Sequence, residues 1–335
     1  MYQEAATAAQ AVAEQLRLDS AAMNAIGEQI RRLAPHTVIT CARGSSDHAA
    51  TYAKYLLETH AGVVVSSASP SISSVYGIAR DLQGCLFIAI SQSGRSPDLL
   101  ATVRAAASAG AVTIALCNDA EAPLVEAADF YIPLRAGPEL CLAATKSYIA
   151  TLAALARLVA AWTGSASLQT SIERLPKLLD RAWSLDWSAA LPLLQCAQHL
   201  FVVGRGFGLG LAQEVALKFK ETCALHAEAF SSAELRHGPL TLLGPEFPAL
   251  IFAQNDATKT GVEALVSELT ARGLPVLVAG TAAGGGVILP TLDCPAEIAP
   301  IVLAGSVYRL LATSALQRGV DPDRPPHLIK VTATL

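Results

Sequence analysis

Short runs of β-forming residues alternate with helical segments along this 335-residue chain, and the alternating series occurs twice. This order is typical of α/β proteins built on a parallel sheet. In the first half, strands are predicted at residues 37–41, 63–66, 86–90, 112–116 and 130–133. A second series of predicted strands lies at residues 200–203, 249–253, 276–279 and 287–289. The pattern therefore predicts an α/β fold with two sheet-forming halves.

The two halves align as copies of one unit. A glycine turn follows the first predicted strand of each half, and Gly44 and Gly206 in these turns lie 162 residues apart. The same offset places Ser91-Gln92-Ser93 over Ala253-Gln254-Asn255, which keeps the polar turn but not the serines. Gly110 and Gly273, each just ahead of a predicted strand, align at an offset of 163. A chance match of glycine-rich turns is the alternative, and three features in the same order favour duplication.

Composition narrows the functional classes. Hydrophobic residues make up 52% of the chain and charged residues 16%, so most of the chain must be buried. The apolar stretch 149–162 is too short to span a bilayer, and the N-terminus lacks a signal-peptide pattern. A net charge of −4 without a basic cluster argues against nucleic-acid binding. Seven scattered cysteines without CxxC spacing predict reduced, mostly buried thiols in a cytoplasmic protein, and no structural zinc site.

A turn rich in hydroxyl groups follows the third predicted strand. Ser91, Gln92, Ser93 and Ser96 lie between that strand and a helix predicted to begin just past Pro97. The free N–H groups and the positive dipole end of a helix N-terminus bind anions, and the hydroxyls add donors without fixed charge. The turn therefore predicts a phosphate site, with a serine-rich helix cap as the plainer interpretation.

In the second half, three charged residues share one face of a predicted helix. Glu214, Lys218 and Glu221 are spaced i, i+4 and i+7. A solvated helix face is the usual explanation of such spacing. Here charge is scarce, and the helix opens directly after the second glycine turn, where ligands bind in open α/β sheets.

A histidine follows at a conformationally restricted position. Ser231 and Glu234 have capping-box spacing and predict a short helix, which Gly238 and Pro239 should end. His237 would then sit on its last turn. A lone histidine is more often structural, but this placement also suits an acid–base residue.

The sequence predicts an N-terminal helical segment at residues 1–34, a first domain at 35–165, a helical linker at 166–197, a second domain at 198–320 and a tail at 321–335. The proline-rich segment 321–326 is predicted to run extended and to pack over the active site. It leads to Lys330, whose amine could form a Schiff base with a carbonyl substrate.

Taken together, these motifs resemble the sugar isomerase (SIS) family, and in particular the isomerase half of glucosamine-6-phosphate synthase. The segments that carry the resemblance are Ser91-Gln92-Ser93-Gly94, Ala144-Thr145-Lys146, Glu214 to Glu221, His226-Ala-Glu-Ala-Phe230, Glu234 to Leu240, and Asp321 to Lys330. The resemblance implies two tandem SIS subdomains, each a flavodoxin-like five-stranded parallel sheet in a three-layer αβα arrangement. It also implies a homodimer that holds a hexose 6-phosphate between the two copies, without cofactor or metal.

The resemblance also assigns roles. Ser91, Gln92, Ser93 and Ser96 would bind phosphate, and Ser46 would contact the sugar with help from Gly44, Ser45 and Ala143. Glu221 would move a proton between C1 and C2, supported by Lys218 and Glu214. His237 would open the sugar ring from the partner subunit, and Lys330 would meet the open-chain carbonyl.

Three departures from the synthase pattern shape the expected activity. Arg95 and Ser96 replace a glutamate and a threonine, a form that resembles stand-alone SIS deaminases, and Ala144 replaces a serine. Too few residues precede the first strand to hold a glutaminase domain. The expected reaction is conversion of glucosamine 6-phosphate and water to fructose 6-phosphate and ammonia. The alternatives are a phosphosugar isomerase or deglycase, ammonia-dependent synthesis, and a non-catalytic sugar-phosphate sensor.

Overall fold

The computed structural model describes residues 1–280 and 284–327. Backbone contacts divide the chain into two compact units, and each is described separately. We call residues 10–139 and 146–174 the first-sheet unit, and residues 1–9, 140–145 and 175–327 the second-sheet unit.

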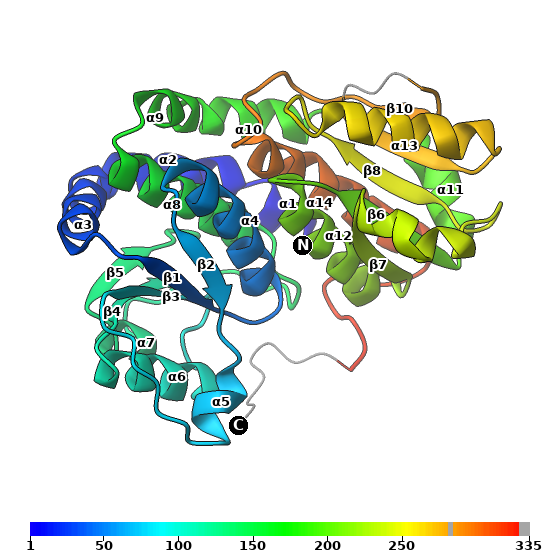
Figure 1. Ribbon diagram of the computed structural model, residues 1–335. Helices are drawn as coiled ribbons and strands as arrows, with labels where there is room; N and C mark the ends of the chain where they lie inside the picture. The colour runs from blue at the N-terminus through cyan, green and yellow to red at the C-terminus, as the bar shows by residue number, and fades with distance from the viewer. Residues whose placement is uncertain (281–283, 328–335) are drawn as a thin grey trace. The chain divides into compact units, whose positions relative to one another are not determined.

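The first-sheet unit is built on five parallel strands in the order β2-β1-β3-β4-β5 (Figure 1). The strands are β1 (Thr37–Cys41), β2 (Val64–Ser67), β3 (Cys85–Ser91), β4 (Val112–Cys117) and β5 (Phe130–Pro133). The central strand β3 is buried along its whole length. Such near-continuous apolar strands are expected where helices cover both faces of a parallel sheet.

The second-sheet unit repeats this topology. Its strands are β6 (His199–Gly204), β7 (His226–Ser231), β8 (Ala249–Ala253), β9 (Val276–Gly280) and β10 (Val287–Leu289). All pairs are parallel and the order is β10-β9-β8-β6-β7, the first sheet's order read from the opposite edge. The first strands begin at Thr37 and His199 and the second strands at Val64 and His226, both 162 residues apart. The prediction of two tandem three-layer α/β subdomains is confirmed.

Nine of the ten strands coincide with predicted runs to within about two residues at each end. The missed strand is β7, whose sequence His-Ala-Glu-Ala-Phe-Ser has neither a run of β-branched residues nor a clear alternation. It is an edge strand paired only with β6, and only Ala227 of its six residues is fully buried. Pairing with β6 therefore outweighs a weak local preference.

The first-sheet unit also contains helices, some on the sheet and others packed against those helices. They are α2 (Ala8–Leu18), α3 (Ser20–Leu33), α4 (Ser45–His60), α5 (Pro70–Ser74), α6 (Pro97–Ser108), α7 (Pro123–Glu126), α8 (Lys146–Thr163) and α9 (Ala166–Glu173). Leu99 and Val103 of α6 pack against Phe87 and Ala115 on one sheet face. Helices α3 and α8 approach closely at Gly27, where a Cβ would lie only 2.6 Å from backbone atoms of Ala161.

The second sheet is covered in the same way. Its unit contains α1 (Tyr2–Ala5), α10 (Leu175–Trp183), α11 (Leu191–Cys196), α12 (Gly208–Cys223), α13 (Lys259–Ala271) and α14 (Ala299–Gln317), with 3₁₀ turns at Ser188–Ala190, Glu234–His237 and Pro239–Leu242. Leu265 and Val266 of α13 pack against Ile251 and Val278. Helix α14 is apolar and long enough to cross a membrane, but 78% of its apolar window is buried inside the protein, as in a core helix.

The segment at residues 321–326 is not extended as predicted. It forms a turn in which the Arg324 N–H donates to the Asp321 carbonyl at 3.2 Å and the Asp323 N–H donates to Asp321 Oδ1 at 2.9 Å. An aspartate that accepts a hydrogen bond from the backbone two residues on favours such a turn, and proline φ angles are compatible with it. The Met1 ammonium pairs with Asp323, and the Cys141 thiol donates to the Pro322 carbonyl. Lys330 lies outside the described residues.

Candidate functional site

The strand order places a topological switch point in each sheet. The chain leaves β1 toward β2 on one side and leaves β3 toward β4 on the other, so the switch point lies at the carboxyl ends of β1 and β3, where ligands bind in open α/β sheets. The two turns at this edge are residues 42–46 and 92–96, which are the glycine turn and the serine turn of the sequence. The fold therefore brings together the ends that carry the candidate phosphate ligands.

The turn after β1 leads directly into α4. Gly44 precedes the helix with φ +54°, a backbone conformation that favours glycine, and Ser45 and Ser46 are the first two helical residues. The first N–H groups of a helix lack intrahelical acceptors and attract anions. Asp47 also lies in this first turn, and burial raises the pKa of its carboxyl group.

The turn after β3 is fixed by the protein itself. Ser91 Oγ accepts from the Gly94 N–H at 3.0 Å, and Gly94 has φ +62° in a space where a Cβ would lie 2.6 Å from Ala122 Cβ. The Ser91 hydroxyl hydrogen is left to donate elsewhere. Gln92, Ser93 and Ser96 are partly exposed, with Ser96 just ahead of α6. The predicted helix start past Pro97 is confirmed, and these side chains border the first turn of α6.

An ion pair joins the two turns. The Arg43 guanidinium donates to Asp98 Oδ2 from Nη2 at 2.7 Å and from Nε at 3.1 Å. The Asp98 side chain is 1% exposed, whereas that of Arg43 is 57% exposed. Asp98 thus holds the turn after β1 against the start of α6 and leaves a cation beside the candidate phosphate ligands. Sequence reasoning did not propose this pair, because Arg43 and Asp98 lie 55 residues apart in the chain and no local pattern links them.

Arg95 makes a different contact. Its guanidinium donates to Asp119 at 2.7 Å on the surface, and this hydrogen bond lowers the pKa of the Asp119 carboxyl group. Within the described residues, Arg95 therefore forms a surface ion pair on the outer side of the turn.

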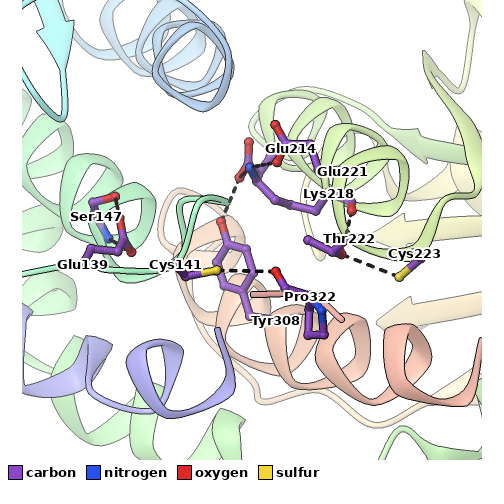
Figure 2. Close-up of polar contacts among 10 residues, drawn as sticks. All are labelled: Glu139, Cys141, Ser147, Glu214, Lys218, Glu221, Thr222, Cys223, Tyr308 and Pro322. Carbon is purple, nitrogen blue, oxygen red and sulfur yellow. Dashed lines mark hydrogen bonds and ion pairs between the residues drawn. The ribbon is translucent and has the colours of Figure 1, made fainter. Parts of the chain in front are cut away.

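The charged residues of α12 form a buried network (Figure 2). The Lys218 ammonium pairs with Glu221 and lies 3.7 Å from Glu214 Oε1, which also accepts a hydrogen bond from the Tyr308 hydroxyl at 2.9 Å. The helix begins beside β6, where a Cβ on Gly204 would lie 2.4 Å from the Gly208 carbonyl oxygen. The solvated-face interpretation is therefore wrong, because the face points into the protein.

The members of this network differ in access. The Glu214 and Lys218 side chains are each 1% exposed, and the Glu221 side chain is 19% exposed. Glu221 is thus the carboxylate that a ligand can reach, with the Lys218 ammonium fixed behind it. The sequence did not point to Tyr308, because it lies on the apolar helix α14, 94 residues from Glu214 in the chain.

The sister helix shows that this burial of charge is not required by the fold. At the offset of 162, Glu214 and Lys218 correspond to Tyr52 and Leu56 of α4, which are both fully buried. Buried ion pairs are seldom more stabilising than apolar side chains of similar volume. The charges on α12 therefore point to a chemical role.

His237 lies at the end of a well-anchored turn. Ser231 Oγ accepts from the Glu234 N–H at 3.1 Å, as the capping box predicts, but the turn is 3₁₀ and a second 3₁₀ turn starts at Pro239. Leu235 is buried, and Arg236 pairs with Glu268 at 3.1 Å. His237 itself is exposed, and no hydrogen bond or ion pair in the described part of the chain joins it to the α12 network.

The remaining predicted residues are placed as follows. Ala143 is buried, so that it could offer a ligand only backbone groups. Glu139, which the sequence did not single out, caps the start of α8 by accepting from the Ser147 N–H and hydroxyl (Figure 2). In the second sheet's aligned turn, Gln254 is buried and donates to the Ala296 carbonyl at 2.9 Å.

Comparison with known proteins agrees with this architecture. The SIS domain model matches residues 34–161 and 193–288. The chain belongs to the SIS domain family. Glutamine–fructose-6-phosphate aminotransferase (isomerizing) of Halobacterium salinarum is 34% identical over 320 residues, covering 90% of this chain and 52% of the relative. The chain spans about half the length of the curated relatives it matches.

Two solved structures extend the likeness to three dimensions. A protein of Silicibacter pomeroyi DSS-3, assigned provisionally as a phosphosugar isomerase, superposes with a TM-score of 0.92 at 37% identity and covers 96% of this chain and 99% of that one. The C-terminal domain of glucosamine-fructose-6-phosphate aminotransferase from Francisella tularensis gives a TM-score of 0.85 at 26% identity, with coverage of 97% and 98%. The SIS subdomains and their sugar isomerase relatives are thus established.

The Arg43–Asp98 pair predicts a stability difference between two isosteric variants. Asp98→Asn should lower the free energy of unfolding by about 1–3 kcal/mol, because a charge-assisted bond to a buried group is weakened. Asp119→Asn, the matched control at the exposed Arg95 pair, should leave the urea unfolding curve unchanged. Overlapping curves for all three proteins would show that Asp98 does not hold the turns.

Proposed function

We propose that this SIS protein is a glucosamine-6-phosphate deaminase that converts glucosamine 6-phosphate and water to fructose 6-phosphate and ammonia. The observation that carries the proposal is the α12 network, in which a reachable Glu221 carboxylate is backed by the buried Lys218 ammonium. A proton shift between adjacent carbons of a sugar needs a carboxylate beside the carbon acid.

The reaction proceeds through the open-chain aldehyde. Glu221 takes the C2 proton while the C1 carbonyl oxygen gains a proton, which leaves an enolamine with a hydroxyl on C1 and the amine on C2. Glu221 then returns a proton to C1 and the nitrogen loses one, so that the proton gained by the oxygen is balanced and the product is an imine at C2. Water adds to the imine to give the ketone of fructose 6-phosphate and release ammonia. Lys218 and Glu214 act as positioning residues. The Tyr308 hydroxyl fixes Glu214, Glu214 lies beside the Lys218 ammonium, and Lys218 in turn holds the Glu221 carboxylate in place.

The serine turn supplies the phosphate ligands in this proposal. Ser93 and Ser96 with Gln92 offer partly exposed donors, Ser91 fixes the turn, and Ser45 and Ser46 open α4 beside it. The partly exposed Arg43 guanidinium adds a positive charge. Two helix N-termini and a cation at one strand edge suit a dianionic phosphate ester.

A phosphosugar isomerase is the second candidate, and the 37% identical Silicibacter protein favours it. Both reactions use the same proton shift and differ in whether C2 carries an amine or a hydroxyl. The Arg95-Ser96-Pro97-Asp98 form of the turn supports the deaminase.

The reduced, mostly buried cysteines support the cytoplasmic location that we also propose; burial raises the pKa of the Cys41 thiol to about 12.

The substrate assay decides between the two candidates. Purified protein incubated with glucosamine 6-phosphate should release ammonia and fructose 6-phosphate in equal amounts, measured by coupled enzymatic assays. Interconversion of fructose 6-phosphate and glucose 6-phosphate without ammonia would establish the isomerase instead.

Replacement of the base separates binding from turnover. Glu221→Gln should lower kcat by at least about 10³-fold, because the amide cannot accept the proton, while sugar-phosphate binding by calorimetry stays nearly unchanged. The exposed Glu246→Gln is the matched control and should keep full activity. Loss of binding in Glu221→Gln would make Glu221 structural.

We further propose a homodimer in which His237 opens the sugar ring at the partner's site, with Lys330 meeting the open-chain carbonyl. The anchored but exposed position of His237 supports this. Mixing inactive Glu221→Gln and His237→Ala subunits in equal amounts, with exchange, should restore about a quarter of the activity, because half of the dimers are then mixed and one of the two sites in each mixed dimer is intact. A mixture as inactive as its parents would place both residues in one subunit's site.

A further inference from the structure

A pair of histidines begins two neighbouring strands at one side of the second sheet (Figure 1). His199 is the first residue of β6 and His226 is the first residue of β7, and the parallel register pairs the two directly. Their Nδ1 atoms lie 3.1 Å apart. Both residues are exposed, and so is the contact between them. A solute can therefore reach the two nitrogens.

The α/β unit does not need this pair. At the offset of 162, the corresponding positions are Thr37 and Val64, which pair in the same register between β1 and β2. The histidines also lie at the amino ends of their strands, whereas the turn that leads from β6 into α12 lies at the carboxyl end. The pair is therefore separate from the groups of the proposed reaction.

The spacing of the two rings fits a single metal ion. Zinc binds imidazole nitrogens at about 2.0–2.1 Å, so that two such nitrogens at the tetrahedral angle lie about 3.3 Å apart. The centroids of the two rings are then about 5 Å apart. Those of His199 and His226 are 5.3 Å apart, with an interplanar angle of 90°. Only a small shift of the rings is needed to place one ion between the Nδ1 atoms.

Both rings can present a bare Nδ1 atom. A hydrogen bond between two Nδ1 atoms needs one protonated nitrogen and one bare nitrogen. No hydrogen bond within the described residues occupies either Nε2 atom, so the donor ring can carry its proton there instead and stay neutral. The Phe247 ring packs against His199 with centroids 5.2 Å apart, which limits the rotation of that imidazole.

Water would complete the coordination of such an ion. Within the described residues, no third histidine, cysteine or carboxylate joins the pair in a metal-binding group. Glu228 is exposed and lies two residues after His226 on the same face of β7, about 7 Å along the strand. Its charge attracts a cation from that distance without ligating it. This open site differs from a four-ligand structural zinc site, which the cysteine pattern argues against.

We propose that His199 and His226 bind one Zn²⁺ ion at the surface through their Nδ1 atoms. Imidazole also suits copper, so Cu²⁺ serves as a spectroscopic probe of the same site. The two histidines are 27 residues apart in the chain and meet only in the folded protein, so the ion stabilises the fold. It does so by joining β6 to the edge strand β7, whose sheet partner is β6.

Zinc titration of the untagged full chain tests the site. Calorimetry in phosphate-free buffer at neutral pH should show one ion bound per chain. His199→Gln and His226→Gln should each weaken binding at least about tenfold, because a single imidazole is left. The controls are His36→Gln, which removes an exposed histidine ahead of β1, and Cys196→Ser, which removes the exposed thiol three residues before His199. Both controls should bind zinc as the unmodified protein does.

Two further readouts show whether one ion contacts both rings. Electron paramagnetic resonance of bound Cu²⁺ should report two imidazole nitrogens in the unmodified protein and at most one in His199→Gln or His226→Gln. Zinc should raise the melting temperature of the unmodified protein and the controls, but not of these two variants. Unchanged zinc affinity in both histidine variants, or no zinc binding by the unmodified protein, would overturn the proposal. Should one variant fail to fold, the titration and copper spectrum of the other decide the outcome.

Discussion

The buried Lys218 ammonium between two carboxylates is the interaction on which the functional account depends. Taking three charged side chains out of water is unfavourable unless each has a partner. Here the Lys218 ammonium forms ion pairs with Glu221 and Glu214, and the Tyr308 hydroxyl donates a hydrogen bond to Glu214. The aligned positions on α4 are the fully buried Tyr52 and Leu56, so the α/β unit folds without these charges. The network therefore fixes one reachable carboxylate in a defined orientation, which is what a proton-transfer step requires.

Duplication explains how the roles are divided. Both sheets have the same strand order and the same switch point, where a turn and a helix N-terminus come together. The first copy keeps serines in its turn and an Arg43–Asp98 pair that holds the two turns together. The second copy replaces the serines by Ala253 and Asn255 and carries its chemistry on α12 instead. In the proposed function, one fold would thus supply an anion-binding edge from one copy and a proton-transfer face from the other.

Local signals in the sequence predicted most of the fold and much of the candidate site. Apolar runs predicted the strands, and the spacing of Glu214, Lys218 and Glu221 placed them on one helix face without any tertiary information. β7 was missed because an edge strand of mixed polarity gains its stability from pairing, and the segment at 321–326 turns because Asp321 caps it. The sequence could not predict Tyr308 and Asp98 as hydrogen-bond partners, because the residues they contact lie far away in the chain. For the same reason it could not predict that the Arg157 guanidinium is buried without an acceptor in the described residues.

Hydrogen exchange at the sugar carbons tests the central claim most directly, and it does so whether the amine or the hydroxyl sugar is the true substrate. Fructose 6-phosphate incubated with the protein in D₂O should lose one of its two C1 proton signals in ¹H NMR, because a 19% exposed Glu221 exchanges its proton with solvent. The same incubation with Glu221→Gln should leave the signal intact. Absence of exchange with the unmodified protein, or equal exchange with the variant, would contradict the account.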